Sequence, residues 1–354
     1  MNSRLLILDG IGGVPLAREI FAACAAHGVD TVYQDCAELP TIPVYGARSA
    51  IAKTLNKCER SDSFFFLAKL AERTVRALLT THRPSRVLVV GFIYKFIAPA
   101  LLDKLKHEFG FSLHLYDTDS CNLYERKREF IFFIEKELPV YDSIFSFSSV
   151  TTRLFRETLG LPVHHLPFGA QPINLPATSA ESHDVLFVGS GDLRRVLLLE
   201  HIREHVSVFG NRWSRNTALM SAPLRERVHD RSVWGNDLYQ LFADAKIVLN
   251  ITRSPFYGAE TGINLRIFEA LAAGAFLLTD HCDEIGALFT PEVELDTFRS
   301  SSELAEKVRW YLDHPSARTE IAQRGHQRFI AEFSWEKRCA ELLRKLGYNI
   351  STDT

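Results

Sequence analysis

The residues best suited to chemistry lie between positions 260 and 280, where charged side chains interrupt an apolar helical pattern. Gly274 suits the end of that predicted helix, and an apolar strand follows it. The helix should therefore begin near Gly262 to Asn264. A helix start carries unpaired N–H groups and a partial positive charge, so it attracts phosphate, and Arg266 in the first turn would add a two-pronged donor.

Glu269 lies one turn beyond Arg266 and could accept hydrogen bonds from two neighbouring hydroxyl groups, such as those of a sugar. The same two residues also fit an ordinary charged pair at positions i and i+3 of a packed helix. Taken alone, the spacing leaves both interpretations open.

The segment resembles the donor-binding helix of the group 1 glycosyltransferases of GT-B fold, in particular the branch of the spore-maturation protein CgeB. The family pattern N-x-R-x-F-E-A-x-A-x-G is matched by Asn264, Arg266, Phe268, Glu269, Ala270, Ala272 and Gly274. The resemblance covers residues 184–343 and, more weakly, 86–169. It implies an α/β protein with two Rossmann-like doubly wound domains facing across a cleft. It also implies a nucleotide sugar on this helix, with Glu269 holding the ribose.

One departure from the family concerns the carboxylates before the helix. Many retaining relatives carry two glutamates eight positions apart, whereas Glu260 and Glu269 are nine apart. Glu260 and Gly262 are kept as candidate donor-binding residues. The departure leaves the role of Glu260, and the choice between retention and inversion of the anomeric configuration, open.

Three further strand ends supply candidate donor-binding residues, because ligands of open parallel sheets bind beyond the carboxyl ends of the strands. Glycines there allow a close backbone approach, a hydroxyl adds a donor, and an arginine in the next turn can reach a diphosphate. The first loop resembles the family's F-V-G-S pattern followed by Arg. The second resembles the family's G-x-x-W turn, and a packed tryptophan explains that turn equally well. At the third strand end, the alternative is that Asn250 caps the next turn. The candidates are Gly189, Ser190, Arg195, Gly210, Trp213 and Asn250.

The N-terminal half should bind the acceptor. Asp9 and Asp117 each end a predicted strand and are candidate bases for an inverting transfer, although an aspartate there more often caps a turn. Gly12, Gly13 and Tyr94 are candidate acceptor-binding residues, the tyrosine being open to a core interpretation as well.

No metal or other cofactor is expected. Asp117-Thr118-Asp119 has the D-x-D form by which glycosyltransferases of another fold hold a divalent ion. Two arginines and a helix start would already neutralise the diphosphate, which makes a metal redundant.

Composition limits the class of protein. The 354 residues are 46% hydrophobic and 24% charged, with a net charge of −2, which suits a folded protein and argues against a dedicated nucleic-acid surface. Six cysteines without a C-x-x-C motif indicate reduced thiols. No apolar run reaches the roughly 20 residues of a transmembrane helix, and no signal peptide is evident, so we expect a cytoplasmic protein.

Strands and helices alternate along the chain, which indicates parallel sheets covered by helices. One helical pattern includes the phenylalanines at 64–66. Prolines and a glycine at 167–172 suggest a hinge. We therefore expect an acceptor domain at 1–168, a donor domain at 169–333, and a C-terminal helix at 334–354 that returns to the first domain.

These observations predict a metal-independent glycosyltransferase that moves a sugar from a nucleotide diphosphate sugar to a hydroxyl of a glycan, protein or small molecule. Two alternatives stay open. A sugar-nucleotide epimerase of the same fold would need no acceptor, and a non-catalytic sugar-nucleotide-binding protein would show no turnover.

Overall fold

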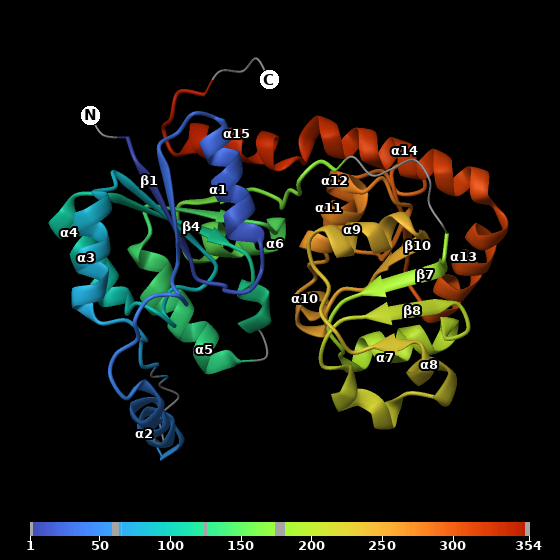
Figure 1. The fold of residues 1–354 in the computed structure, drawn as a ribbon, viewed down its shortest axis with the longest axis horizontal. Coiled ribbons are helices and arrows are strands. Elements are labelled where there is room, and N and C mark those ends of the chain that lie inside the picture. Colours follow the sequence, from blue (N-terminus) through green and yellow to red (C-terminus); the bar gives the residue numbers. More distant parts are fainter. Residues whose placement is uncertain (1–2, 59–63, 65, 124–125, 174–180, 351–354) are drawn as a thin grey trace. The chain divides into compact units, whose positions relative to one another are not determined.

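The computed structural model describes residues 3–58, 64, 66–123, 126–173 and 181–350. It divides the chain into two compact units. The first unit comprises Met1–Leu166 together with Cys339–Thr354, and the second comprises Pro167–Arg338. Figure 1 shows both as sheets covered by helices.

The first unit is built on a parallel sheet of six strands in the order β2-β1-β3-β4-β5-β6. Its inner strands are apolar and buried along almost their whole length, as expected where helices cover both faces. The strands are β1 (Leu5–Asp9), β2 (Thr31–Asp35), β3 (Arg86–Val90), β4 (Ser112–Asp117), β5 (Ser143–Ser146) and β6 (Val163–His165).

The helices of the first unit are α1 (Leu16–Ala26), α2 (Tyr45–Cys58), α3 (Glu72–His82), α4 (Pro99–Phe109), α5 (Lys127–Phe132) and α6 (Ser149–Arg153). Three of them, α1, α3 and α4, bury apolar side chains in the core of the unit, and α2 is considered below. The last helix, α15 (Trp335–Lys345), contains the boundary between the units. Its Cys339 lies against the Ile20 carbonyl of α1, and Arg86 of β3 donates to the carbonyl of Leu346 just beyond it.

One predicted helix of this unit begins in the wrong place. The sequence pattern includes Phe64 and Phe66 in it, whereas α3 starts only at Glu72. The two phenylalanine rings instead pack edge-on against Phe132 and Tyr94. Burial of large aromatic side chains in this cluster outweighs a local helical spacing.

The second unit has its own six-stranded parallel sheet, in the order β12-β11-β10-β7-β8-β9. Its strands are β7 (His183–Val188), β8 (Val206–Phe209), β9 (Val228–His229), β10 (Ala245–Asn250), β11 (Leu277–Asp280) and β12 (Asp296–Phe298). The chain runs outward from β7 through β8 and then returns to the other side of β7 with β10. The strand order therefore reverses at β7, and such reversal points are where open α/β sheets bind ligands.

Its helices are mostly short and connect successive strands. They are α7 (Leu193–Leu199), α8 (Ala222–Glu226), α9 (Asn236–Ala243), α10 (Ser254–Gly258), α11 (Leu265–Ala272), α12 (Asp283–Leu288), α13 (Ser301–Asp313) and α14 (Pro315–Glu332). The predicted stop of α11 is confirmed, since Gly274 follows it in the left-handed conformation with φ of 69°.

Candidate functional site

The turns after β7 and β8 meet so closely that position 210 must be glycine. A Cβ built on Gly210 would lie 1.9 Å from the carbonyl oxygen of Gly189, and Gly210 has a φ of 146°. The Gly189 N–H donates to the Phe209 carbonyl at 2.8 Å. The ring N–H of the buried Trp213 donates to the Gly189 carbonyl at 2.9 Å. Both predicted glycines thus shape the turn, while Trp213 supports it from inside.

A pocket of about 240 Å³ opens above these turns, at the carboxyl ends of the central strands. We call it the loop pocket. It is lined by Val188, Gly189, Ser190, Gly210, Asn211, Arg212, Ser232, Val233, Trp234, Arg253 and Arg266. The structure therefore brings together four of the residues predicted from sequence, namely the two glycines, Ser190 and Arg266.

The lining of the loop pocket is cationic. Three arginines line it, Arg212, Arg253 and Arg266, and no aspartate or glutamate does so among the residues that the structure describes. Such a wall favours a ligand with more than one negative charge.

Arg266 and Glu269 form a pair, with 2.7 Å between Nη1 and Oε2. The pair is not on the surface, because the side chains are only 13% and 5% exposed. The Arg266 guanidinium also lies 5.4 Å from the centre of the Trp234 ring. Arg266 is thus held by a carboxylate and an aromatic face while it lines the pocket.

Arg195 lies beneath the pocket wall rather than in it. Its guanidinium donates to the carbonyl of Ile251 from two nitrogens, at 2.9 and 2.7 Å, and to the carbonyl of Ser190 at 2.7 Å. Burial lowers its pKa to about 10, so it still carries a positive charge at neutral pH. These contacts make it a brace that ties the turn after β7 to the end of β10, and its charge adds to the field at the pocket.

The start of α11 is organised by Asn264. Its side chain accepts from the N–H of Arg266 at 3.1 Å and donates to the carbonyl of Gly262 at 3.3 Å, which makes it the N-cap. A Cβ on Gly262 would lie 2.5 Å from the sulfur of Cys282, so no side chain fits there. Glu260 is exposed, with a φ of 58°. None of these three lines the loop pocket.

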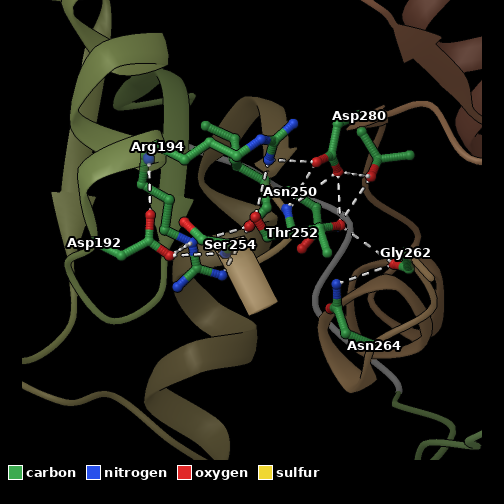
Figure 2. A network of polar contacts seen from close by, with 11 residues as sticks. Asp192, Arg194, Asn250, Thr252, Ser254, Gly262, Asn264 and Asp280 are labelled. Carbon is green, nitrogen blue, oxygen red and sulfur yellow. Dashed lines mark hydrogen bonds and ion pairs between the residues drawn. The ribbon is translucent and has the colours of Figure 1, made fainter. Parts of the chain in front are cut away.

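A buried polar network, drawn in Figure 2, fixes the backbone at Thr252, the residue before Arg253. The Asp280 carboxylate accepts from the N–H of Thr252 at 3.0 Å, from its hydroxyl at 2.9 Å and from Arg194 Nη1 at 2.7 Å. Arg194 also donates to the Thr252 carbonyl at 2.9 Å. The predicted Asn250 belongs here, since its side-chain amide donates to the hydroxyl of Thr279 and not into the pocket.

Sequence reasoning missed Arg212, Arg253 and Trp234 as well as the Arg194–Asp280 pair. Arg212 lies within the G-x-x-W turn, between its glycine and its tryptophan. Arg253 follows a predicted strand by three residues. A search for every cation within a few residues of a strand end would have found both.

In the first unit, Asp9 and Asp117 are both buried and both cap turns. Asp9 accepts from the N–H of Ile11 at 2.9 Å and from the Tyr33 hydroxyl at 2.8 Å. Asp117 accepts from the hydroxyl and the N–H of Ser120, and burial raises the pKa of this carboxyl. These contacts favour the capping alternative for both residues.

The other first-unit candidates have different surroundings. Gly12 and Gly13 follow β1 with φ of 67° and 75°, and Gly12 donates its N–H to Asp9 at 3.2 Å. Tyr94 is 1% exposed and donates its hydroxyl to Glu129, so its ring belongs to the core. Within the described ranges, no group of three or more His, Cys, Asp or Glu side chains could hold a metal ion, and no helix is long and apolar enough to span a bilayer.

Comparison with known proteins agrees with this geometry. Residues 194–344 match the model of a family described as glycosyl transferase-like. Comparison with the curated protein sequences gives no match.

Solved structures that resemble this one include glycosyltransferases, and the similarity extends over nearly the whole length of both chains. HepE of Anabaena, solved with UDP-glucose, has a TM-score of 0.67 and 13% identity, covering 97% of this chain and 99% of that one. Sucrose-phosphate synthase of Thermosynechococcus elongatus has a TM-score of 0.66 and 14% identity, with coverage of 97% and 99%. A glycosyltransferase of Rickettsia africae has a TM-score of 0.64 and 11% identity, with coverage of 97% for both. The chain therefore has the fold of the GT-B glycosyltransferases, and its residues 194–344 match the glycosyl transferase-like family.

Proposed function

We propose that the protein transfers a sugar from a nucleotide diphosphate sugar to a hydroxyl group of a glycan, a protein or a small molecule. The observation that carries this proposal is the loop pocket. Three arginines and two glycine turns line it, at the point where the strand order of the second unit reverses. A diphosphate has the charge and the oxygens that such a wall binds.

The pocket would act on the leaving group. When the glycosidic bond breaks, negative charge grows on the departing diphosphate. Fixed cations then stabilise the transition state more than the ground state, by about 3 kcal/mol for a well-aimed donor. Arg266 and Arg253 are suited to this, because Glu269 pairs with Arg266, and Asp280 fixes the backbone at Thr252 beside Arg253. These cations also take the place of a metal, which the proposal does not require.

The remaining parts of the donor have proposed positions too. Glu269 would accept hydrogen bonds from the ribose hydroxyls while Arg266 fixes its carboxylate. Trp234, which is 40% exposed and lines the pocket, offers an aromatic face to the base. The acceptor would bind the first unit.

Two finer assignments complete the proposal. The match of residues 264–274 to the CgeB pattern supports that branch of the family. The free cysteines of the described residues, four of them buried, suit a reducing compartment and so a cytoplasmic protein.

A thermal-shift screen tests donor binding. Ligands that bind only the folded state raise its stability, so one nucleotide among UDP, GDP, dTDP and CMP, or its sugar, should raise the Tm. The nucleoside diphosphate should act more strongly than its monophosphate or nucleoside. A Tm that none of these ligands changes would count against a nucleotide-sugar donor.

Incubation with the selected donor separates the three activities. A transferase yields a glycosylated product only when an acceptor pool is present. An epimerase changes the sugar nucleotide without an acceptor, and a binding protein leaves it unchanged in both mixtures.

A further inference from the structure

Helix α2 exposes an apolar stripe at the edge of the first unit. Val44, just before the helix, is 73% exposed, Ile51 is 62% exposed and Leu55 is 61% exposed. These are the three highest values among the large apolar side chains that the structure describes. Ile51 and Leu55 follow the helical repeat and so lie on one face, and Val44 precedes the helix with a φ of 55°.

The stripe is not the face by which α2 attaches to its unit. Tyr45 donates its hydroxyl to the Leu67 carbonyl at 3.3 Å, and Ala52, seven residues later, is buried. Before the helix, the N–H of Ile42 donates to the Lys69 carbonyl at 2.7 Å. Figure 1 shows α2 set apart from the helices that cover the sheet of this unit. The helix therefore has two apolar faces, of which one holds it and the other is presented outward.

The exposed stripe carries positive charge. Arg48 is four residues after Val44 and three before Ile51, so it lies within the stripe. Lys53 adds to the charge of the helix, and the chain has no aspartate or glutamate between Glu38 and Glu59.

An apolar stripe that includes the cation Arg48, on a helix without acidic residues, fits a partner that is apolar and anionic. We propose that α2 docks the protein on the surface of a bilayer that contains anionic lipids. The apolar side chains would enter the boundary between headgroups and acyl chains, and Arg48 would meet a lipid phosphate. A two-fold contact with a second copy is less favourable. It would bring together two Arg48 side chains and two helices that have basic but no acidic residues.

Co-sedimentation with vesicles tests this directly on the full chain. We expect binding to phosphatidylcholine vesicles that contain about one-third phosphatidylserine, and much weaker binding to phosphatidylcholine alone. Ile51→Ser with Leu55→Ser should lower vesicle binding about tenfold or more, because two apolar side chains that would enter the bilayer are lost. Arg48→Gln should weaken binding to the anionic vesicles only.

The matched control makes the same chemical change elsewhere. Leu197 and Leu219 are 59% and 53% exposed in the second unit, so Leu197→Ser with Leu219→Ser should leave vesicle binding unchanged. Both double variants should keep the Tm and the nucleotide-induced shift of the wild type, which separates this proposal from the donor site.

Three results would overturn it. One is no binding to anionic vesicles, and another is equal binding by wild type and the α2 double variant. The third is a dimer in analytical ultracentrifugation that the α2 double variant dissociates, since that would assign the stripe to a second copy of the chain.

Discussion

Arg253 is the residue whose role can be tested with least disturbance of the fold. It lines the loop pocket at the N-cap of α10, and the carboxylates of the network bind its neighbours instead. A charge-assisted hydrogen bond contributes about 1.5–3 kcal/mol, so Arg253→Gln should weaken the nucleoside diphosphate about 10- to 100-fold. The nucleoside alone should bind unchanged.

Titration calorimetry measures both affinities. Arg203→Gln is the control, because Arg203 is an exposed arginine of the same unit that pairs with Glu204 and does not line the pocket. An equal loss for nucleoside and diphosphate in the Arg253 variant would show that the guanidinium does not bind phosphate.

The Arg266–Glu269 pair should contribute to the free energy of unfolding as well as to the lining of the pocket. Both side chains are largely buried, so Arg266→Met takes the guanidinium counter-charge from a buried carboxylate and should cost about 3 kcal/mol of unfolding free energy. Arg266→Met with Glu269→Gln should cost less than the sum of the two single changes, by about 1–3 kcal/mol. Chemical denaturation of the four proteins measures this coupling. Additive losses would mean that the pair contributes nothing beyond packing.

At the scale of elements, the site depends on the close approach of the two turns that follow β7 and β8. Gly210→Ala would place a Cβ at 1.9 Å from the Gly189 carbonyl and push the two turns apart. We expect a loss of about 1–3 kcal/mol in stability, together with loss of nucleotide binding. Gly286→Ala is the control, because a Cβ there meets nothing within 4 Å. Nucleotide binding that survives Gly210→Ala at full affinity would exclude this turn from the site.

Elements with strong local signals could be predicted from the sequence. Helix α4 begins at Pro99 and ends before Gly110, and strand β8 is an apolar run that ends at Gly210, so each carries its own boundary signals. Strands β6, β9 and β12 are not predicted from the sequence, because they have only three, two and three residues. Their pairing depends on neighbours that are distant in the sequence.

The site divides in the same way. Gly189, Gly210 and Arg266 could be predicted because a local turn or helix start explains each of them. Arg253 could not, because only the strand order β8-β7-β10 brings the loop after β10 beside the turns after β7 and β8. The sequence predicts Arg195 near the turn after β7. It does not predict that the guanidinium is buried and donates to the carbonyl of Ile251.

At the scale of the whole molecule, two buried groups of the first unit make opposite contributions to the pH dependence of stability. Burial raises the pKa of Glu137 to about 7, and its carboxylate accepts from the N–H groups of Ile93 and Tyr94. Burial lowers the pKa of His114 to about 4, and its ring bonds Ser143 and Ser112. Each group therefore binds protons differently in the folded and unfolded chain.

The signs follow from which state holds the proton. Between pH 4.5 and 7, Glu137 is protonated in the folded state and ionised in the unfolded one, so its contribution to stability falls as the pH rises. Between pH 4 and 6.5, His114 is neutral in the folded state and charged in the unfolded one, so its contribution rises with pH. The two slopes oppose each other over most of this range.

Single variants separate the two slopes. The stability deficit of Glu137→Gln relative to wild type should shrink by about 3 kcal/mol as the pH rises from 4.5 to 7, because the variant lacks the falling term. The deficit of His114→Gln should instead grow by a similar amount, about 3 kcal/mol, from pH 4 to 6.5, because that variant lacks the rising term. Urea unfolding at closely spaced pH values measures both differences. Deficits that stay constant with pH would mean that neither group changes its proton affinity on folding.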